Sequence, residues 1–172
     1  MPSIDRLAPE FELEDLTGKP HRLSEYRGRI AIVNFWSAEC PWTERVDHEL
    51  TRLLPGWGEH VALLTLAGNV NEESALILEQ AHHRGLVSVL LAARTGVPEA
   101  YDAKTTPHLF VVDPDGILRY QGAFDDVTFR QRTPAVGYLA QAVEALLSGG
   151  RPDPAETPPY GCALVRQLPD SC

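Results

Sequence analysis

Runs of apolar residues alternate along the chain with amphipathic segments, and this alternation predicts strands followed by helices. Three runs without a polar face are typical of buried strands: RIAIVNFW at residues 29–36, HVALLTLAG at 60–68 and LVSVLLA at 86–92. Two hairpins are also expected. The first is FELEDLTGKPHRL at residues 11–23, around a Gly-Lys-Pro turn. The second covers residues 108–122, where Pro114 and Gly116 supply the geometry of the turn DPDG.

A helix is predicted directly after Cys40. Pro41 occupies a first helical position, where proline is tolerated. Apolar residues then recur at helical spacing until Pro55 and Gly56 end the run; they are Trp42, Val46, Leu50, Leu53 and Leu54. Cys40 is therefore expected at a helix N-terminus, where free N–H groups and the helix dipole stabilise a thiolate.

Caps and breakers predict two more helices in the middle of the chain. Asn71 is expected to cap the first of them, with Glu72 and Glu73 in its positive first turn and Gly85 past its end. A short helix is expected at residues 97–101. These helices separate the predicted strands, as in proteins whose strands run parallel.

The last predicted helix has Thr133 as its cap and Pro134 at its first position, and it stops at the glycine pair 149–150. The tail, residues 151–172, holds five of the chain's fourteen prolines and is expected to be extended. We therefore predict one α/β domain over residues 1–150 and a proline-rich tail after it. Strands alternating with helices imply a central, mostly parallel sheet that is covered on both faces.

The composition argues against several classes of protein. The chain has 172 residues, 44% of them apolar, which suits one domain with a sizeable core. Its net charge of −9 argues against binding of nucleic acid, because the phosphates would be repelled. No apolar run is long enough to span a bilayer, so no membrane association is expected. The N-terminal MPSIDRLAPEFELED lacks the apolar run of a secretory signal, and the expected location is cytoplasmic.

The chain has three cysteines, Cys40, Cys162 and Cys172. No Cys-x-x-Cys pair and no His-x-x-x-His spacing occurs, so neither a metal site nor a disulfide scaffold is expected. Cys40 is the expected reactive thiol because of its place at a helix N-terminus. Cys172, the last residue, is expected to be incidental. The spacing leaves open whether Cys40 has a partner thiol.

The buried strand, FWSAEC, the helix and the later TTPHLFVVDPDG together resemble the thioredoxin-like superfamily, above all its bacterial redoxins of the TlpA and AhpC/TSA type. The resemblance covers about residues 5–165. It implies a thioredoxin-like fold with a central mixed sheet flanked by helices and an N-terminal hairpin. It also implies that Cys40 is the nucleophile and that a cis proline at Pro107, preceded by Thr106, faces it.

Two positions depart from the thioredoxin pattern. Thr43 stands where a Cys-x-x-Cys site has its second cysteine, so no vicinal disulfide can form. Asn34 stands where thioredoxins bury an aspartate that helps to move protons, and an amide does not titrate. The usual thioredoxin mechanism is therefore not available unchanged, and a non-catalytic binding module with a degenerate site is one alternative.

A peroxiredoxin-like thiol peroxidase with an antioxidant role is the other alternative, because peroxiredoxins work with one peroxidatic cysteine. Ser37 matches the Thr or Ser that they have three residues before it. Val33 occupies the position of their proline, and Pro107 that of the arginine that activates the peroxide. Another arginine would have to replace it in space: Arg94, Arg119 or Arg130. Peroxidase activity therefore ranks second.

The tail resembles the same redoxins, since ETPPYGCALVR matches the TxxxGCxIK ending of a group whose first site is also a lone Cys-Pro. In that group the C-terminal cysteine lies near the helix cysteine. The resemblance thus implies that Cys162 pairs with Cys40 and resolves its mixed disulfides. It implies a thiol–disulfide oxidoreductase without a cofactor, whose partners are protein or small-molecule thiols and disulfides and a dithiol that donates electrons.

Four residues around Cys40 are expected to contact substrate: Ser37, Trp42, Thr106 and Pro107. His108, next to Pro107, is expected to be a surface residue of its strand rather than a proton shuttle.

Overall fold

The computed structural model describes residues 2–167, and a mixed five-stranded sheet forms its centre. The strand order is β5-β4-β3-β7-β8, with β4 and β5 parallel to β3, and with β7 and β8 added in antiparallel fashion. The bounds are β3 (Ile30–Trp36), β4 (Val61–Ala67), β5 (Leu90–Leu91), β7 (His108–Val112) and β8 (Leu118–Gly122). The predicted α/β class is confirmed, and the sheet is mixed rather than mostly parallel because the last hairpin joins it.

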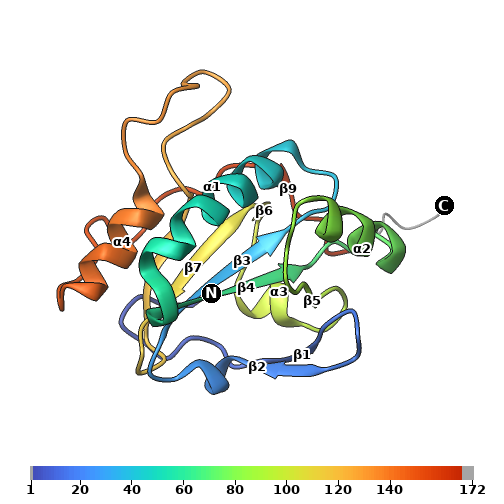
Figure 1. Ribbon diagram of the computed structural model, residues 1–172, viewed down its shortest axis with the longest axis horizontal. Coiled ribbons are helices and arrows are strands. Elements are labelled where there is room, and N and C mark those ends of the chain that lie inside the picture. Colours follow the sequence, from blue (N-terminus) through green and yellow to red (C-terminus); the bar gives the residue numbers. More distant parts are fainter. Residues whose placement is uncertain (1, 168–172) are drawn as a thin grey trace.

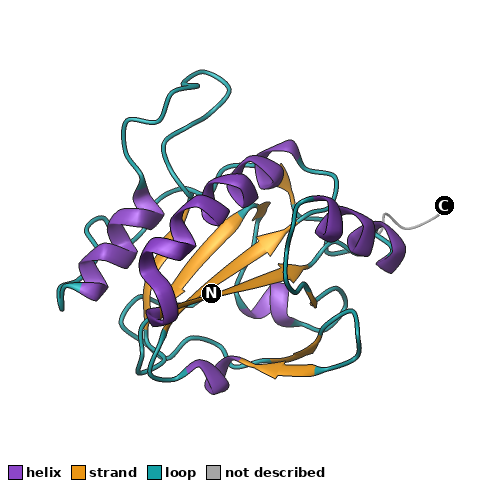
Figure 2. Cartoon of the chain, viewed as in Figure 1, coloured by secondary structure: helices purple, strands orange, loops and turns teal. Residues whose placement is uncertain are grey.

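Three helices cover one face of this sheet. Figures 1 and 2 show α1 lying across the strands, with α4 on one side of it and α2 on the other. The opposite face carries α3 and the N-terminal hairpin of β1 and β2, which confirms the predicted hairpin. The bounds are α1 (Pro41–Trp57), α2 (Ser74–His83), α3 (Val97–Ala100), α4 (Tyr138–Leu147), β1 (Glu12–Glu14) and β2 (Pro20–Arg22), with 3-10 turns at Leu23–Tyr26 and Gly58–His60.

The central strand β3 is buried along its whole length because both of its faces are covered. Ile30 and Ile32 pack with α1 and α4, while Val33 and Phe35 pack with α3 and the hairpin. Trp36, at the end of β3, belongs to a third apolar cluster under α2. The predicted strand without a polar face is thus a strand between two cores, and it carries the chain directly to Cys40.

The helix after Cys40 extends beyond its predicted end. α1 continues through Pro55 to Trp57, and Gly58, with a φ of 60°, terminates it. Trp57 is buried against the core that α1 shares with α4, so packing extends the helix beyond its local breaker. The third predicted strand is shorter than expected, since only Leu90–Leu91 of residues 86–92 pairs with β4.

Two predicted helix starts are wrong, and tertiary contacts explain both. α2 begins at Ser74, so Asn71 does not cap it, and Glu72 is a buried residue outside the helix. α4 begins at Tyr138 with Gly137 at its N-cap position, so Thr133 and Pro134 lie in the preceding loop. Asp126 accepts hydrogen bonds from the N–H groups of residues 135 and 136, which holds this stretch in the loop instead of a helical turn.

The tail returns across the domain after α4, and its predicted extended conformation is confirmed for residues 151–167. Its short strand β9 (Cys162–Ala163) pairs antiparallel with β6 (Thr105–Thr106), directly before β7. Residues distant in sequence therefore meet at the end of β3. Within residues 2–167, no helix combines the length and the apolar character that crossing a membrane requires.

Candidate active site

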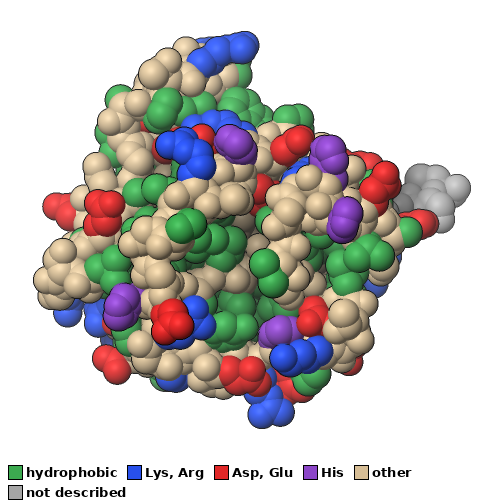
Figure 3. Space-filling model, in the orientation of Figure 1, with side chains coloured by type: hydrophobic (Ala, Val, Ile, Leu, Met, Phe, Trp, Pro, Cys, Tyr) green, Lys and Arg blue, Asp and Glu red, His purple; other side chains and the backbone are tan. Residues whose placement is uncertain are grey.

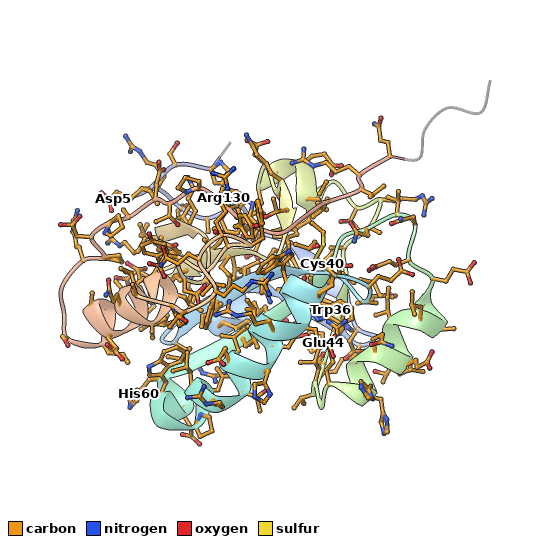
Figure 4. The ribbon with its side chains drawn as sticks, turned by 90° about the horizontal axis from the view of Figure 1, so that it is seen from above. Asp5, Trp36, Cys40, Glu44, His60 and Arg130 are labelled. Carbon is orange, nitrogen blue, oxygen red and sulfur yellow. A yellow bond between two sulfur atoms is a disulfide. The ribbon has the colours of Figure 1, made fainter. Side chains whose placement is uncertain are left out.

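Cys40 is the N-cap residue of α1, as predicted, and Pro41 fills the first helical position. The side chain is almost completely buried, with 2% of Cys40 exposed. Its Sγ lies 3.1 Å from the carbonyl oxygen of Thr106, and Figure 4 shows the residue at the start of the helix. In the reduced protein this carbonyl can accept a hydrogen bond from the thiol, whereas the helix N-terminus favours the thiolate.

Cys162 provides the partner thiol. It stands opposite Thr106 in the β6–β9 pair and forms a disulfide with Cys40, with a Cα–Cα distance of 6.1 Å and a sequence separation of 122. The pairing implied by the family resemblance is therefore confirmed. Gly161 permits this approach, because a Cβ at this position would overlap the carbonyl of Thr106 and lie 3.0 Å from Cδ of Pro107.

The peptide bond between Thr106 and Pro107 is cis, as the resemblance implied. Thr106 is fully buried, and its backbone contacts both cysteine segments: its carbonyl lies at Cys40, and its strand pairs with that of Cys162. Thr106 and Pro107 are thus beside the disulfide, where substrate contact was predicted.

Residues 155–166, here termed the strap, are anchored on both sides of Cys162. On the N-terminal side, the N–H of Thr157 donates to Gln121 O at 3.1 Å, and its Oγ1 accepts from the N–H of Ala123 at 2.9 Å. On the C-terminal side, Leu164 N donates to Lys104 O at 3.0 Å. Val165 makes two more hydrogen bonds on this side: its N–H donates to Asn69 Oδ1 at 2.8 Å, and its carbonyl accepts from Val70 N at 2.9 Å. Non-covalent contacts therefore already hold the strap where the disulfide forms.

Trp42 is a half-buried residue in the first turn of α1, two positions after Cys40. Its ring meets that of Tyr160 edge-on, with centroids 4.9 Å apart, and the Tyr160 hydroxyl accepts a hydrogen bond from the N–H of Phe129. A hollow of about 290 Å³ opens next to them, lined by Trp42, Arg45, Val127, Thr128, Phe129 and Arg132. Trp42 is therefore placed where a partner can touch it. No local pattern in the sequence points to Tyr160, because its contact with Trp42 depends on where the strap lies.

The residues considered for peroxidase chemistry are engaged elsewhere. The buried Ser37 donates its hydroxyl proton to Glu72 Oε2 at 2.6 Å, and Val33 is part of the core. Arg119 pairs with Asp113 and with a second carboxylate, and Arg130 lies over the ring of Phe129. Within the described part of the chain, neither these two nor Arg94 has a hydrogen bond or ion pair with Cys40.

Polar side chains lie buried under α1. Asn34 and Thr43 are fully buried, and their side-chain N and O atoms have no hydrogen-bond partner among residues 2–167. Asp47 accepts hydrogen bonds from Trp36 Nε1 at 2.7 Å and from Arg84 at 3.2 Å. Burial raises the pKa of Asp47 to about 6, against the lowering effect of these two donors. Nothing in the sequence singles out Asp47, because a charged residue on a helix normally faces water.

The expectation that His108 lies on the surface is wrong. Its side chain is buried, lies against the ring of Phe110 with centroids 4.5 Å apart and accepts a hydrogen bond from the N–H of Lys104 at 3.2 Å. Burial lowers its pKa to about 4. His108 is thus neutral at pH 7.

No group of three or more potential metal ligands is found among the described residues. Cys172 lies outside them. Figure 3 shows a hollow with apolar side chains in the middle of the face that carries α1 and α2. Two hollows on that side, of about 470 and about 400 Å³, are lined by neither Cys40 nor Cys162. These two hollows are therefore separate from the disulfide.

Comparison with known proteins agrees with this geometry. Residues 4–121 match the AhpC/TSA family. The thiol-disulfide oxidoreductase ResA of Geobacillus kaustophilus is 32% identical over 118 residues, which are 68% of this chain and 67% of that protein.

Two solved structures are also similar. An uncharacterized conserved protein from Geobacillus kaustophilus has a TM-score of 0.88 at 25% identity, covering 99% of this chain and 95% of its own. The thioredoxin domain of a thiol-disulfide oxidoreductase from Bacteroides vulgatus has a TM-score of 0.63 at 19% identity, covering 77% and 94%. The predicted thioredoxin-like fold is confirmed.

Proposed function

The chain belongs to the AhpC/TSA family, and from this membership and its disulfide we propose that it is a thiol–disulfide oxidoreductase with Cys40 as nucleophile and Cys162 as resolving cysteine. The observation that carries the proposal is the bond between these two residues, because it joins a thiol at a helix N-terminus to one on a separately anchored strap. The similarity to ResA supports the same class of reaction.

The proposed reaction is an exchange in two steps. The thiolate of Cys40 attacks one sulfur of a substrate disulfide, forms a mixed disulfide and releases the other substrate sulfur as a thiolate. The thiolate of Cys162 then attacks Cys40 Sγ, forms the intramolecular disulfide and expels the second substrate thiolate. Two electrons have passed to the substrate, and a dithiol donor returns them. The cysteines carry the electrons, so the reaction requires no cofactor.

The strap has to move during this cycle. Cys40 is 2% exposed and lies under the β6–β9 pair, so a substrate sulfur reaches it only when Cys162 and its neighbours are displaced. Reduction of the disulfide leaves hydrogen bonds and side-chain contacts as the links between strap and domain. Protein or small-molecule disulfides with an accessible sulfur are the proposed substrates, and Trp42 and the adjacent hollow are the proposed contact area.

Trapping experiments test the two roles. Reduced Cys162→Ser protein, mixed with a small aromatic disulfide, should accumulate a stable mixed disulfide on Cys40, identified by non-reducing peptide mapping. The Cys172→Ser protein serves as a matched control and should release the substrate thiol completely. Insulin reduction with dithiothreitol should be lost in Cys40→Ser. Full activity of Cys40→Ser would refute the proposal.

The cytoplasmic location stays a prediction, which cell fractionation with immunoblotting would test.

A further inference from the structure

The three residues 37–39 lie between the end of β3 and Cys40, and they are termed the Cys40 loop. Residues of such a connection have backbone N–H and C=O groups that no strand or helix pairs. These groups are nevertheless buried or half-buried here. Their partners are two charged side chains that flank α2, far along the chain.

Glu72, two residues before the start of α2, binds the N–H side of the loop. Its carboxylate accepts hydrogen bonds from the Ser37 hydroxyl at 2.6 Å, from Ala38 N at 3.0 Å and from Glu39 N at 3.4 Å. Glu72 is only 8% exposed. A buried carboxylate with three donors is well satisfied, and each bond to a charged group is stronger than one to a neutral group.

Arg84, directly after α2, binds the C=O side of the same loop. Its guanidinium donates to Ser37 O at 3.1 Å and to Ala38 O at 2.5 Å. It also donates to Asp47 of α1 at 3.2 Å and lies over the ring of Trp36, with Cζ 5.1 Å from the ring centroid. The side chain is 5% exposed. Arg84 thus ties the loop to the end of β3 and to α1.

The arrangement is costly if stability is its only purpose. Removing two charges from water carries a large desolvation penalty, and apolar residues often stabilise a fold equally well. Both charged groups instead bind the three residues that precede the nucleophile. Glu72 binds their N–H groups and Arg84 binds their C=O groups. A displacement of a reacting atom by about 1 Å can slow a reaction by about 100-fold, so rigid support of Cys40 has a direct effect on rate.

We propose that Glu72 and Arg84 are positioning residues for Cys40, which fix the Cys40 loop from the two ends of α2 and tune the reactivity of the thiolate in opposite directions. The inference rests on the proposed role of Cys40 as nucleophile. Arg84 carries a positive charge, which favours the thiolate, and Glu72 carries a negative charge, which disfavours it. Both charges are buried near Cys40, so salt screens their effect on the thiolate only weakly.

These opposite charges give the proposal a signature that loss of structure does not produce. Arg84→Met should raise the apparent pKa of Cys40 and Glu72→Gln should lower it, each by about half a unit or more. Both should slow the reduction of insulin by about 10-fold or more, because the loop is less firmly held. Six other charged or titratable residues near Cys40 along the chain or around its site are the same in both variants: Glu39, Glu44, Arg45, Lys104, His108 and Tyr160. Asp47 loses a donor in Arg84→Met, which raises its pKa further, so Asp47→Asn is combined with Arg84→Met to separate the two effects.

The measurement is the rate of iodoacetamide alkylation of Cys40 against pH, in the reduced full chain, resolved by peptide mass spectrometry. Circular dichroism and thermal melts confirm that each variant is folded. Glu73→Gln and Arg52→Met are matched controls, since they remove the same charges from exposed positions, and both should leave the pKa and the rate unchanged. Arg84→Lys keeps the charge without the planar fork, so it should keep the pKa and still slow insulin reduction.

A second variant keeps the proposal testable if Glu72→Gln does not fold. Ser37→Ala removes one contact of Glu72 but no charge, and should slow exchange while leaving the pKa of Cys40 in place. Shifts of that pKa in the same direction in Arg84→Met and Glu72→Gln, or no change in rate in either, would overturn the inference. Activity that survives Cys40→Ser would instead contradict the proposed function, so the two failures are distinguishable.

Discussion

Breaking the Cys40–Cys162 bond should lower the free energy of unfolding by about 5 kcal/mol. The bond closes a loop with a sequence separation of 122, and in the chain-entropy model a cross-link over that length costs the unfolded chain this much conformational freedom. Domains of this size are commonly stable by about 5–15 kcal/mol. The reduced protein should therefore still fold, with a much smaller margin. The same amount of free energy favours disulfide formation in the folded state over the unfolded one.

Urea unfolding followed by tryptophan fluorescence measures this difference, with the oxidised protein compared to the same protein in a non-thiol reductant. The oxidised form should also show a weaker dependence on urea, because its unfolded state stays cross-linked. Cys162→Ser should behave like the reduced wild type and show no effect of reductant, and Cys172→Ser should retain the full difference. A difference below about 1 kcal/mol would refute the reasoning, as would an equal effect of reductant on Cys162→Ser.

Three further predictions follow from the same site. Gly161→Ala should slow formation of the disulfide by about 10-fold or more, because the added methyl group overlaps the carbonyl of Thr106; an unchanged rate in a quenched alkylation time course would contradict this. Hydrogen peroxide should oxidise Cys40 no faster than an ordinary thiolate, and rapid, saturable consumption in stopped-flow fluorescence would instead indicate a peroxidase. Two opposing contributions should offset each other in the pH dependence of stability of the wild type. The folded pKa of Asp47 is raised from 3.8 to about 6, so its contribution falls as pH rises through this range, while that of His108 is lowered from 6.5 to about 4, so its contribution falls as pH drops. His108→Gln leaves only the Asp47 contribution, so its urea midpoint should fall from pH 4 to 6. Asp47→Asn leaves only the His108 contribution, so its midpoint should rise over the same range. Midpoints that change in the same way in both variants would refute both pKa shifts.

Local sequence patterns predicted those elements whose structure depends on neighbouring residues alone. The run at residues 29–36 is apolar on both faces, and the helix after Cys40 has a proline where a first turn tolerates it. These two features already place the thiol at a helix N-terminus. The partner is different, because the terminal place of Cys172 only argues against that residue, and no local pattern points from Cys162 to Cys40. Only the family resemblance paired the two residues, since a contact across 122 positions leaves no periodic pattern in the sequence.

The wrong expectations share a physical cause. Asn71 and Thr133 are good caps by residue type, but Glu72 binds the Cys40 loop and Asp126 binds residues 135 and 136, which keeps both stretches out of a helix. His108 is expected on the surface as a histidine of a strand, whereas every residue of this strand is buried. In each case a contact from a distant segment outweighs a local preference.

The distance between the two cysteines along the chain changes what the disulfide does. In a Cys-x-x-Cys site both sulfurs belong to one helical turn, so reduction leaves the rest of the fold in place. Here Thr43 has the position of the second thiol, and the sulfur that closes the bond arrives on the strap. Hydrogen bonds worth about 0.5–1.5 kcal/mol each are left to hold the strap after reduction. The disulfide therefore keeps the strap over Cys40 in the oxidised protein, and its reduction makes displacement of the strap easier. In the proposed cycle, a substrate disulfide thus reaches Cys40 in the reduced state, which is the state that can attack it.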